Sequence, residues 1–140
     1  MSEEEINRDI YLLQKYQEQV EEIYGELDFL DRLIQEYKRS IDTMQEMVDS
    51  SSHEVLMPIG GNAFAYGEIK SVDRVLVNVG SGIFIEKPLN AAIETLNRRM
   101  DELKKSQEKL ISTVEEIRQK MDEIASKLRE GNVPVSEKED

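Results

Sequence analysis

Two long segments of the chain repeat apolar residues at alternating spacings of three and four. In the first segment every a position is apolar, and Asp9 is the one polar residue among the d positions. The a positions are Ile6, Leu13, Val20, Leu27, Ile34, Ile41 and Val48, and the d positions are Asp9, Tyr16, Ile23, Leu30, Tyr37 and Met44. A period of 3.5 sustained over this length predicts a coiled-coil seam rather than an ordinary amphipathic surface helix.

The same spacing returns in the last third of the chain, with Gln107 as its single polar exception. The repeating residues are Leu89, Ile93, Leu96, Met100, Leu103, Gln107, Leu110, Val114, Ile117, Met121, Ile124 and Leu128. Two such helices of nearly equal length, joined by a short insert, predict a long antiparallel α-helical coiled-coil hairpin.

The ends of both helices are marked by residues typical of helix termini. Ser2 and Glu5 have the spacing of a capping box, so we expect the first helix over residues 2–50. Pro88 suits the first turn of the second helix, because a missing N–H costs nothing there. We therefore expect the second helix over residues 88–130.

The alignment of the two helices follows from the heptads, because an antiparallel pair places a layers opposite d layers. Pairing residues whose numbers sum to 137 does this throughout and matches both helix ends. The polar exceptions then face leucine, with Asp9 opposite Leu128 and Gln107 opposite Leu30. We interpret Gln107 as a core residue that sets the register rather than as a ligand. We expect water to reach Asp9, since it lies near the free end.

The insert at residues 55–87 changes the apolar period from 3.5 to 2, which predicts two β-hairpins between the helices. The expected strands are 55–59 and 63–69 around Gly60, Gly61 and Asn62, and 74–79 and 82–87 around Gly80 and Ser81. Glycine and asparagine supply the positive φ angles that tight hairpin turns require. The fold class is therefore α+β. Residues 1–140 form one domain, in which 131–140 are expected to be a disordered tail.

Isolated two-stranded hairpins are marginally stable in water, and these are short and apolar. We therefore expect their strands to join strands of other subunits in an inter-subunit β-barrel. The residues expected to mediate oligomerisation are Leu56, Ile59, Phe64, Tyr66, Val75, Val77, Val79, Ile83 and Ile85.

Charge and composition exclude several classes of function. The net charge is −12, and the first 50 residues carry 14 acidic against 5 basic side chains. A nucleic-acid backbone would be repelled by that surface. No apolar run approaches the roughly 20 residues of a transmembrane helix, and no signal-peptide pattern opens the chain. The absence of cysteine suits a reducing compartment. We therefore expect a cytoplasmic protein that binds neither nucleic acid nor membrane.

The chain offers little material for catalysis. His53 is its only histidine and it has no cysteine, so a His/Cys metal cluster is impossible. The glycine pairs lack the spacing of nucleotide-binding loops and fall where the hairpins need turns. We expect no catalytic residue, no metal and no cofactor.

Residues 56–64 (LMPIGGNAF) and 79–83 (VGSGI), with two hairpins between equal coiled-coil arms, resemble the prefoldin family over nearly the whole chain. The number of hairpins points to the α class of archaeal type, because β subunits of that family have one hairpin and α subunits have two. The resemblance implies a hetero-hexamer of two α and four β subunits with a double β-barrel platform. It also implies that the arm tips hold non-native polypeptides without ATP and pass them to a group II chaperonin.

Client binding requires apolar residues beyond those that the seam uses. At the end far from the hairpins, side chains flanking the first helix seam widen its apolar stripe, and the second helix supplies a facing wall. The residues expected to bind clients are Ile6, Ile10, Leu12, Leu13, Met121, Ile124 and Leu128. The alternative function is a structural coiled-coil scaffold or spacer that oligomerises through its hairpins and needs no apolar excess at its free end.

Overall fold

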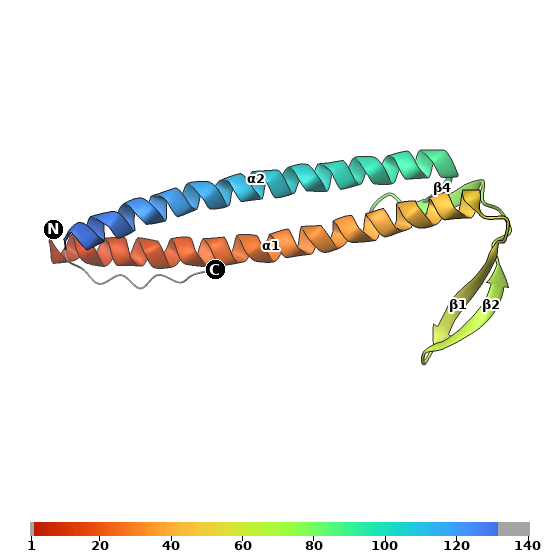
Figure 1. The fold of residues 1–140 in the computed structure, drawn as a ribbon, viewed down its shortest axis with the longest axis horizontal. Coiled ribbons are helices and arrows are strands. Elements are labelled where there is room, and N and C mark those ends of the chain that lie inside the picture. The colour runs from red at the N-terminus through yellow and green to blue at the C-terminus, as the bar shows by residue number, and fades with distance from the viewer. Residues whose placement is uncertain (1, 132–140) are drawn as a thin grey trace. The chain divides into compact units, whose positions relative to one another are not determined.

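The computed structural model describes residues 2–131, so nearly all of the expected tail at 131–140 lies outside the described residues. The elements along the chain are α1 (Glu3–Asp49), β1 (Glu54–Gly60), β2 (Ala63–Glu68), β3 (Arg74–Asn78), β4 (Phe84–Pro88) and α2 (Leu89–Glu130). Two long helices thus enclose two β-hairpins in the sequence, as predicted (Figure 1).

The start of α1 is fixed by the predicted cap. The Glu5 amide donates to the Ser2 hydroxyl at 3.2 Å, and Glu3, Glu4 and Glu5 place negative charge at the positive end of the helix dipole. The Ile6 amide donates to the Ser2 carbonyl at 3.1 Å, which closes the first turn. Local sequence therefore determines where α1 begins.

The start of α2 differs by one residue from the expectation. Pro88 is the last residue of β4 and pairs with Arg74, so α2 begins at Leu89. The Leu89 amide donates to the Asp73 carbonyl at 2.8 Å. The loop before β3 thereby satisfies an amide that the helix itself leaves without an acceptor.

The described residues form two compact units. Unit 1 consists of residues 2–32 and 103–131, and unit 2 consists of residues 33–102. Unit 1 therefore contains the start of α1 and the end of α2. Unit 2 contains both hairpins with the adjoining parts of the helices.

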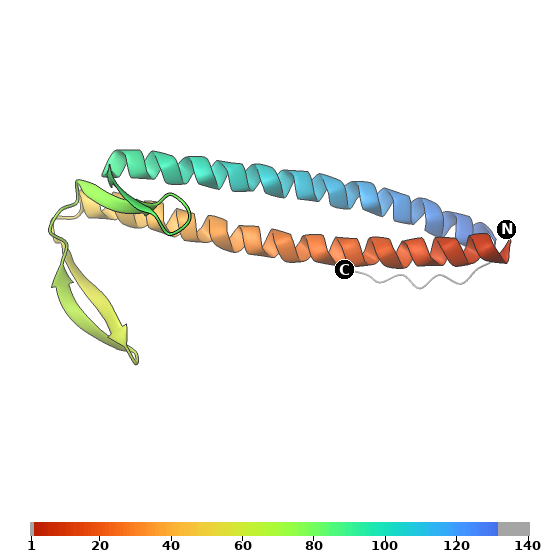
Figure 2. The ribbon, with the colours of Figure 1, turned by 180° about the vertical axis from the view of Figure 1, so that it is seen from behind.

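In unit 1 the start of α1 lies beside the end of α2 in both ribbon views (Figures 1 and 2). Val20, Val114 and Ile117 form a buried cluster. Partly buried side chains that complete three layers of the seam pack against it, namely Tyr16, Ile23 and Met121. The pairs Val20–Ile117, Ile23–Val114 and Tyr16–Met121 each sum to 137, so this cluster agrees with the predicted antiparallel register.

In unit 2 the hairpin β3–β4 is tied to the helices. Val77 is 6% exposed and lines a groove with Tyr37, Met44 and Leu96. The Lys87 ammonium donates to the Thr95 hydroxyl at 3.2 Å, which links β4 to the first turns of α2. This face of the hairpin is therefore covered in part within the subunit, since Val77 is buried whereas its ladder partner Ile85 is 46% exposed.

The strands form two separate antiparallel sheets of two strands each. In the first turn Gly61 and Asn62 have φ values of 55° and 61°, as the tight hairpin turn requires. A register shift between Pro58 and Gly60 marks a bulge next to this turn. Each strand has one edge without a strand partner among the described residues, which leaves backbone groups free for another chain.

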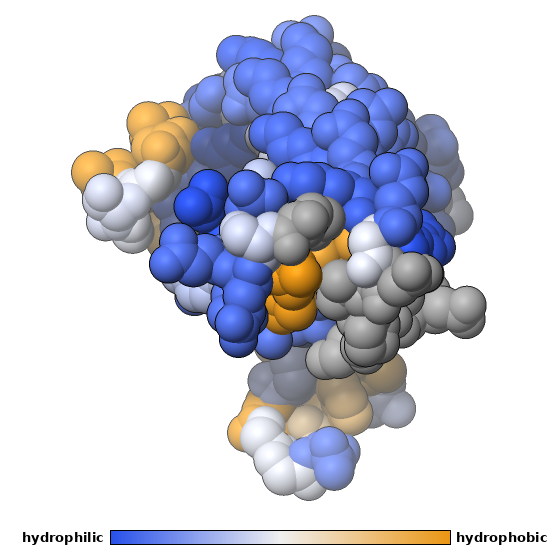
Figure 3. Space-filling model, turned by 90° about the vertical axis from the view of Figure 1, so that its left-hand side faces the viewer, coloured by the Kyte–Doolittle hydropathy of each residue, from blue (hydrophilic) through white to orange (hydrophobic). Residues whose placement is uncertain are grey.

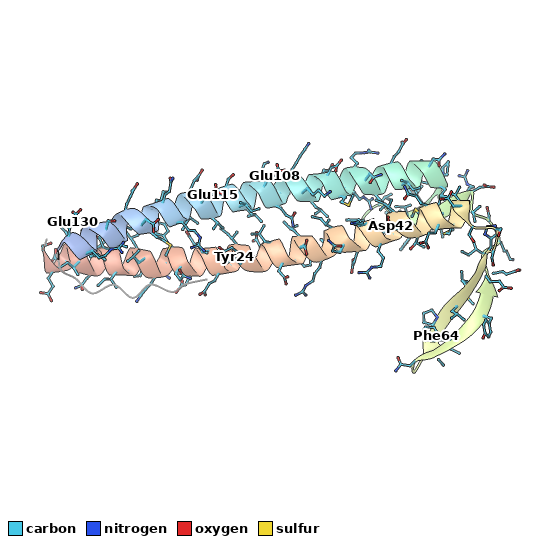
Figure 4. All side chains as sticks on the ribbon, in the orientation of Figure 1. Tyr24, Asp42, Phe64, Glu108, Glu115 and Glu130 are labelled. Carbon is cyan, nitrogen blue, oxygen red and sulfur yellow. The ribbon has the colours of Figure 1, made fainter. Side chains whose placement is uncertain are left out.

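The cluster around Val20 predicts that substitutions at two neighbouring positions of α2 differ strongly in the stability they cost. Ile117→Ala removes a buried side chain and should cost about 2 to 5 kcal/mol of stability. Glu115→Ala changes an exposed position of the same helix (Figure 4) and should stay within about 0.5 kcal/mol. Thermal unfolding followed by circular dichroism measures both variants. Equal melting temperatures would show that this seam register is wrong.

Candidate interaction surfaces

The hairpin β1–β2 exposes one apolar face. Ladder pairs Leu56–Tyr66 and Pro58–Phe64 place these four side chains on the same side of the sheet. Their exposed fractions include 60% for Leu56, 57% for Phe64 and 91% for Tyr66. Phe64 projects from the hairpin into open space in Figure 4. This chain does not cover these side chains itself, so the surface has the character of an unpaired interface.

The opposite face of β1–β2 is more enclosed. Val55, Ala65 and Gly67 are half-buried, and Met57 lies over Gly67. A Cβ at Gly67 would come within 3.0 Å of the Met57 methyl carbon, so the glycine makes room for the methionine. The absence of a side chain at Gly67 thus lets Met57, which is itself 49% exposed, lie across this face.

The valines of β3–β4 lie on a face that is covered in part within the chain. Val75 and Val77 lie on the face toward the groove, and Val77 is buried within the subunit. Val77, one of the residues expected to mediate oligomerisation, is already covered by side chains of the same chain, so its role in assembly stays a prediction. Val79, Ile83 and Ile85 are exposed, as an interface residue must be before assembly.

The open face of β3–β4 instead presents Leu76 and Phe84, which are 68% and 60% exposed. Leu76 pairs with Glu86 and Phe84 with Asn78, which places all four on one side of the sheet. The sequence prediction missed Leu76 and Phe84. A signal was present, because residues 75–79 and 83–85 are apolar at nearly every position, and such runs are typical of strands buried on both faces.

At the end of unit 1, six of the seven residues predicted to bind clients are partly exposed. We call the residues 3–13 of α1 and 121–130 of α2 the tip. The half-buried side chains are Ile6, Ile10, Leu12, Leu13, Met121 and Ile124. Tyr11, which the prediction missed, is 56% exposed. Figure 3 looks onto this end and shows a small apolar surface beside hydrophilic side chains.

Leu128 and Asp9 are both buried at the tip. Leu128 is 1% exposed, so its expected contact with clients stays a prediction. Asp9 is 8% exposed rather than accessible to water. Its seam position turns the carboxylate toward α2, where the Lys127 ammonium lies 3.4 Å from Oδ2. The predicted pairing of Asp9 with Leu128 explains both burials, because the two residues occupy one layer.

Apolar exposure in unit 1 is not confined to the tip. Phe29 is 61% exposed and Ile111 is 48% exposed, although neither belongs to the seam. Tyr24 also flanks the seam, but its hydroxyl accepts a hydrogen bond of 2.6 Å from Arg118, whose guanidinium also lies 5.8 Å from the ring centre. Tyr24 of α1 is thus held in contact with Arg118 of α2 and is less available to a client.

The remaining chemistry of the described residues is sparse. Within residues 2–131 no group of three or more His, Cys, Asp or Glu side chains could hold a metal ion. In the same part of the chain no helix is sufficiently long and apolar to cross a membrane. His53 is half-buried at the base of β1–β2, where its carbonyl accepts the Ile69 amide at 2.9 Å. This hydrogen bond joins the residue before β1 to the residue after β2.

Comparison with known proteins agrees with the order and kind of these elements. A family model described as prefoldin subunit matches residues 16–132. A prefoldin subunit alpha from Archaeoglobus fulgidus is 35% identical over 106 residues, covering 74% of this chain and 77% of the relative. A prefoldin subunit alpha from Methanosarcina mazei is 34% identical over 96 residues, covering 66% and 68%.

Among solved structures, filamentous PFD from Methanocaldococcus jannaschii matches with a TM-score of 0.74 at 22% sequence identity. The match covers 83% of this chain and 97% of the solved one, and at this identity it supports the fold alone. Two long helices, two hairpins between them and a family match over most of the length point to one conclusion. The chain belongs to the prefoldin family of chaperone subunits and is similar to its α members.

Proposed function

We propose that this chain is the α subunit of an ATP-independent cytoplasmic chaperone, a hetero-hexamer of two α and four β subunits. Its hairpins form the platform with strands of neighbouring subunits. Its tip captures non-native polypeptides and hands them to a group II chaperonin. The observation that carries the proposal is the open apolar face of each hairpin in a chain of the prefoldin family.

The hairpins support assembly for a physical reason. Leu56, Phe64 and Tyr66 on one sheet, and Leu76 and Phe84 on the other, are all at least 57% exposed in the single chain. Covering such side chains contributes roughly 25 cal/mol for each Å² of apolar surface removed from water. Strand edges without partners supply hydrogen bonds that fix the orientation of the neighbouring subunit.

The tip supports client capture through side chains that the seam covers only in part. Ile10, Leu12 and Tyr11 leave apolar surface accessible beside the seam. Contact with an unfolded polypeptide through such surface needs no nucleotide, because the hydrophobic effect is not directional and requires no chemical step. The terminal turns of a helix also open at low cost, which makes seam residues available for short periods.

The open face of β3–β4 generates a prediction about assembly. Leu76→Asp together with Phe84→Asp places charge where we propose that another subunit packs, and burial of an unpaired charge is costly. Light scattering of the variant mixed with β subunits should show a species smaller than the hexamer. Circular dichroism should show the helices retained.

The matched control on this face is Glu86→Gln, which removes an exposed ion pair with Arg74. The control should assemble normally, because exposed pairs are worth about 0 to 1 kcal/mol. A hexamer that persists with both aspartates would remove these strands from the platform.

The tip generates a prediction about client binding. Ile10→Ser with Leu12→Ser should weaken suppression of aggregation of an unfolded client without ATP, while the oligomer persists. The loss should be partial, because several arms act together and a multivalent grip tolerates the loss of single contacts. Moderate salt should change the wild-type activity little, since the interaction is apolar.

Phe29→Ser is the control for the tip, because it removes a 61% exposed apolar side chain elsewhere in unit 1. It should leave client protection unchanged. Full protection after the tip substitutions, with the oligomer intact, would instead favour a structural scaffold in which this chain mounts the arms of other subunits. Equal losses in both variants would show that the tip has no special role.

A further inference from the structure

Asp9 is the one charged residue in the seam of α1, and it lies in the tip. The surrounding layer is tightly packed, since Leu128 is 1% exposed and Ala125 is 4% exposed. The Asp9 side chain itself is 11% exposed. A carboxylate therefore occupies a position where every other a and d residue of α1 is apolar or aromatic.

The carboxylate is incompletely satisfied. Its Oδ2 atom is buried and has no hydrogen-bond partner among the described residues. Lys127 supplies the compensating charge at 3.4 Å, but the Lys127 side chain is 53% exposed. Bringing a carboxylate out of water costs free energy that one such contact repays poorly. Replacing a buried ion pair by apolar residues often stabilises a protein for this reason.

We propose that Asp9 is a positioning residue that keeps the tip able to open, so that the buried seam side chains Leu128 and Ile124 become available to a bound polypeptide. This inference deepens the proposed function and rests on it for the role of the client. In the closed form Leu128 is covered, so opening of the last turns is the step that would expose it.

The second polar seam residue, Gln107, provides a contrast within the same unit. Gln107 is half-buried and neutral, and it lies five to six helical turns from Lys127 along α2, by the helix repeat. Removing its polarity should stabilise the seam locally without affecting the tip. Gln107→Leu is therefore the matched control for Asp9→Leu.

The experiment uses the assembled oligomer and compares wild type with Asp9→Leu, Asp9→Asn and Gln107→Leu. Hydrogen exchange of the tip amides should slow about fivefold or more in Asp9→Leu, and by less in Asp9→Asn. Gln107→Leu should leave tip exchange unchanged. Client protection measured without nucleotide should fall in Asp9→Leu although apolar surface has been added, and it should be retained in Gln107→Leu.

Lys127→Gln should destabilise the tip, whereas Asp9→Leu should stabilise it, because Lys127→Gln leaves the Asp9 carboxylate without its cation. Exchange of the tip amides should then be faster than in wild type. This variant also distinguishes the proposed effect from misfolding of Asp9→Leu. The exchange rate of the tip amides must fall in Asp9→Leu and rise in Lys127→Gln. Unchanged or slower hydrogen exchange of the tip amides in Lys127→Gln would contradict the proposal.

Two results for Asp9→Leu would overturn the inference. Tip exchange that does not slow would show that the acid does not loosen the tip, and slowed exchange with full client protection would show that opening is not needed for capture. A changed oligomer size would assign Asp9 to register setting instead. A wild-type oligomer that protects no client would contradict the proposed function, while the exchange rates would still decide whether Asp9 controls opening.

Discussion

The apolar seam between α1 and α2 is the interaction on which the other features depend. Each helix carries a narrow stripe of apolar residues that cannot be buried by the helix alone, so one stripe covers the other. The cluster of Val20, Val114 and Ile117 shows this packing within unit 1. Most of the remaining helix surface is polar or charged, although Phe29 and Ile111 are exposed outside the seam.

The hairpins follow a different rule, because they carry more apolar surface than one chain covers. The groove of unit 2 buries Val77, but the other face of the same sheet leaves Leu76 and Phe84 open. The first hairpin exposes Phe64 and Tyr66 in the same way. Side chains of this kind have a physical reason to meet another subunit, whereas the charged flanks of the helices do not.

The two polar residues of the seam are not equivalent. Gln107 is neutral and half-buried, so its presence costs little and suits the setting of a register. Asp9 is charged and 8% exposed, and its nearest cation is half-exposed. In the mechanism that we propose, this buried carboxylate lets the tip open so that seam side chains can reach a client. Unit 1 thus combines an apolar buried cluster around Val20 with a buried carboxylate in the tip.

The sequence by itself determined the helices, their antiparallel alignment in unit 1, and the two hairpins. These features depend on local chemistry and periodicity, namely the 3.5 repeat, the cap at Ser2 and the positive φ values of Gly61 and Asn62. The assignment of subunit contacts to the hairpins and of client binding to the tip stays a prediction.

Tertiary structure alone decided which face of each strand is covered. The run around Leu76 and Val77 is apolar on both sides, so a period of two cannot distinguish the inner from the outer face. The start of α2 at Leu89 depended on the Asp73 carbonyl, which is distant in the sequence. The burial of Asp9 depended on Leu128 and Lys127 of the opposite helix. In each case the deciding contact joins residues that no local pattern connects.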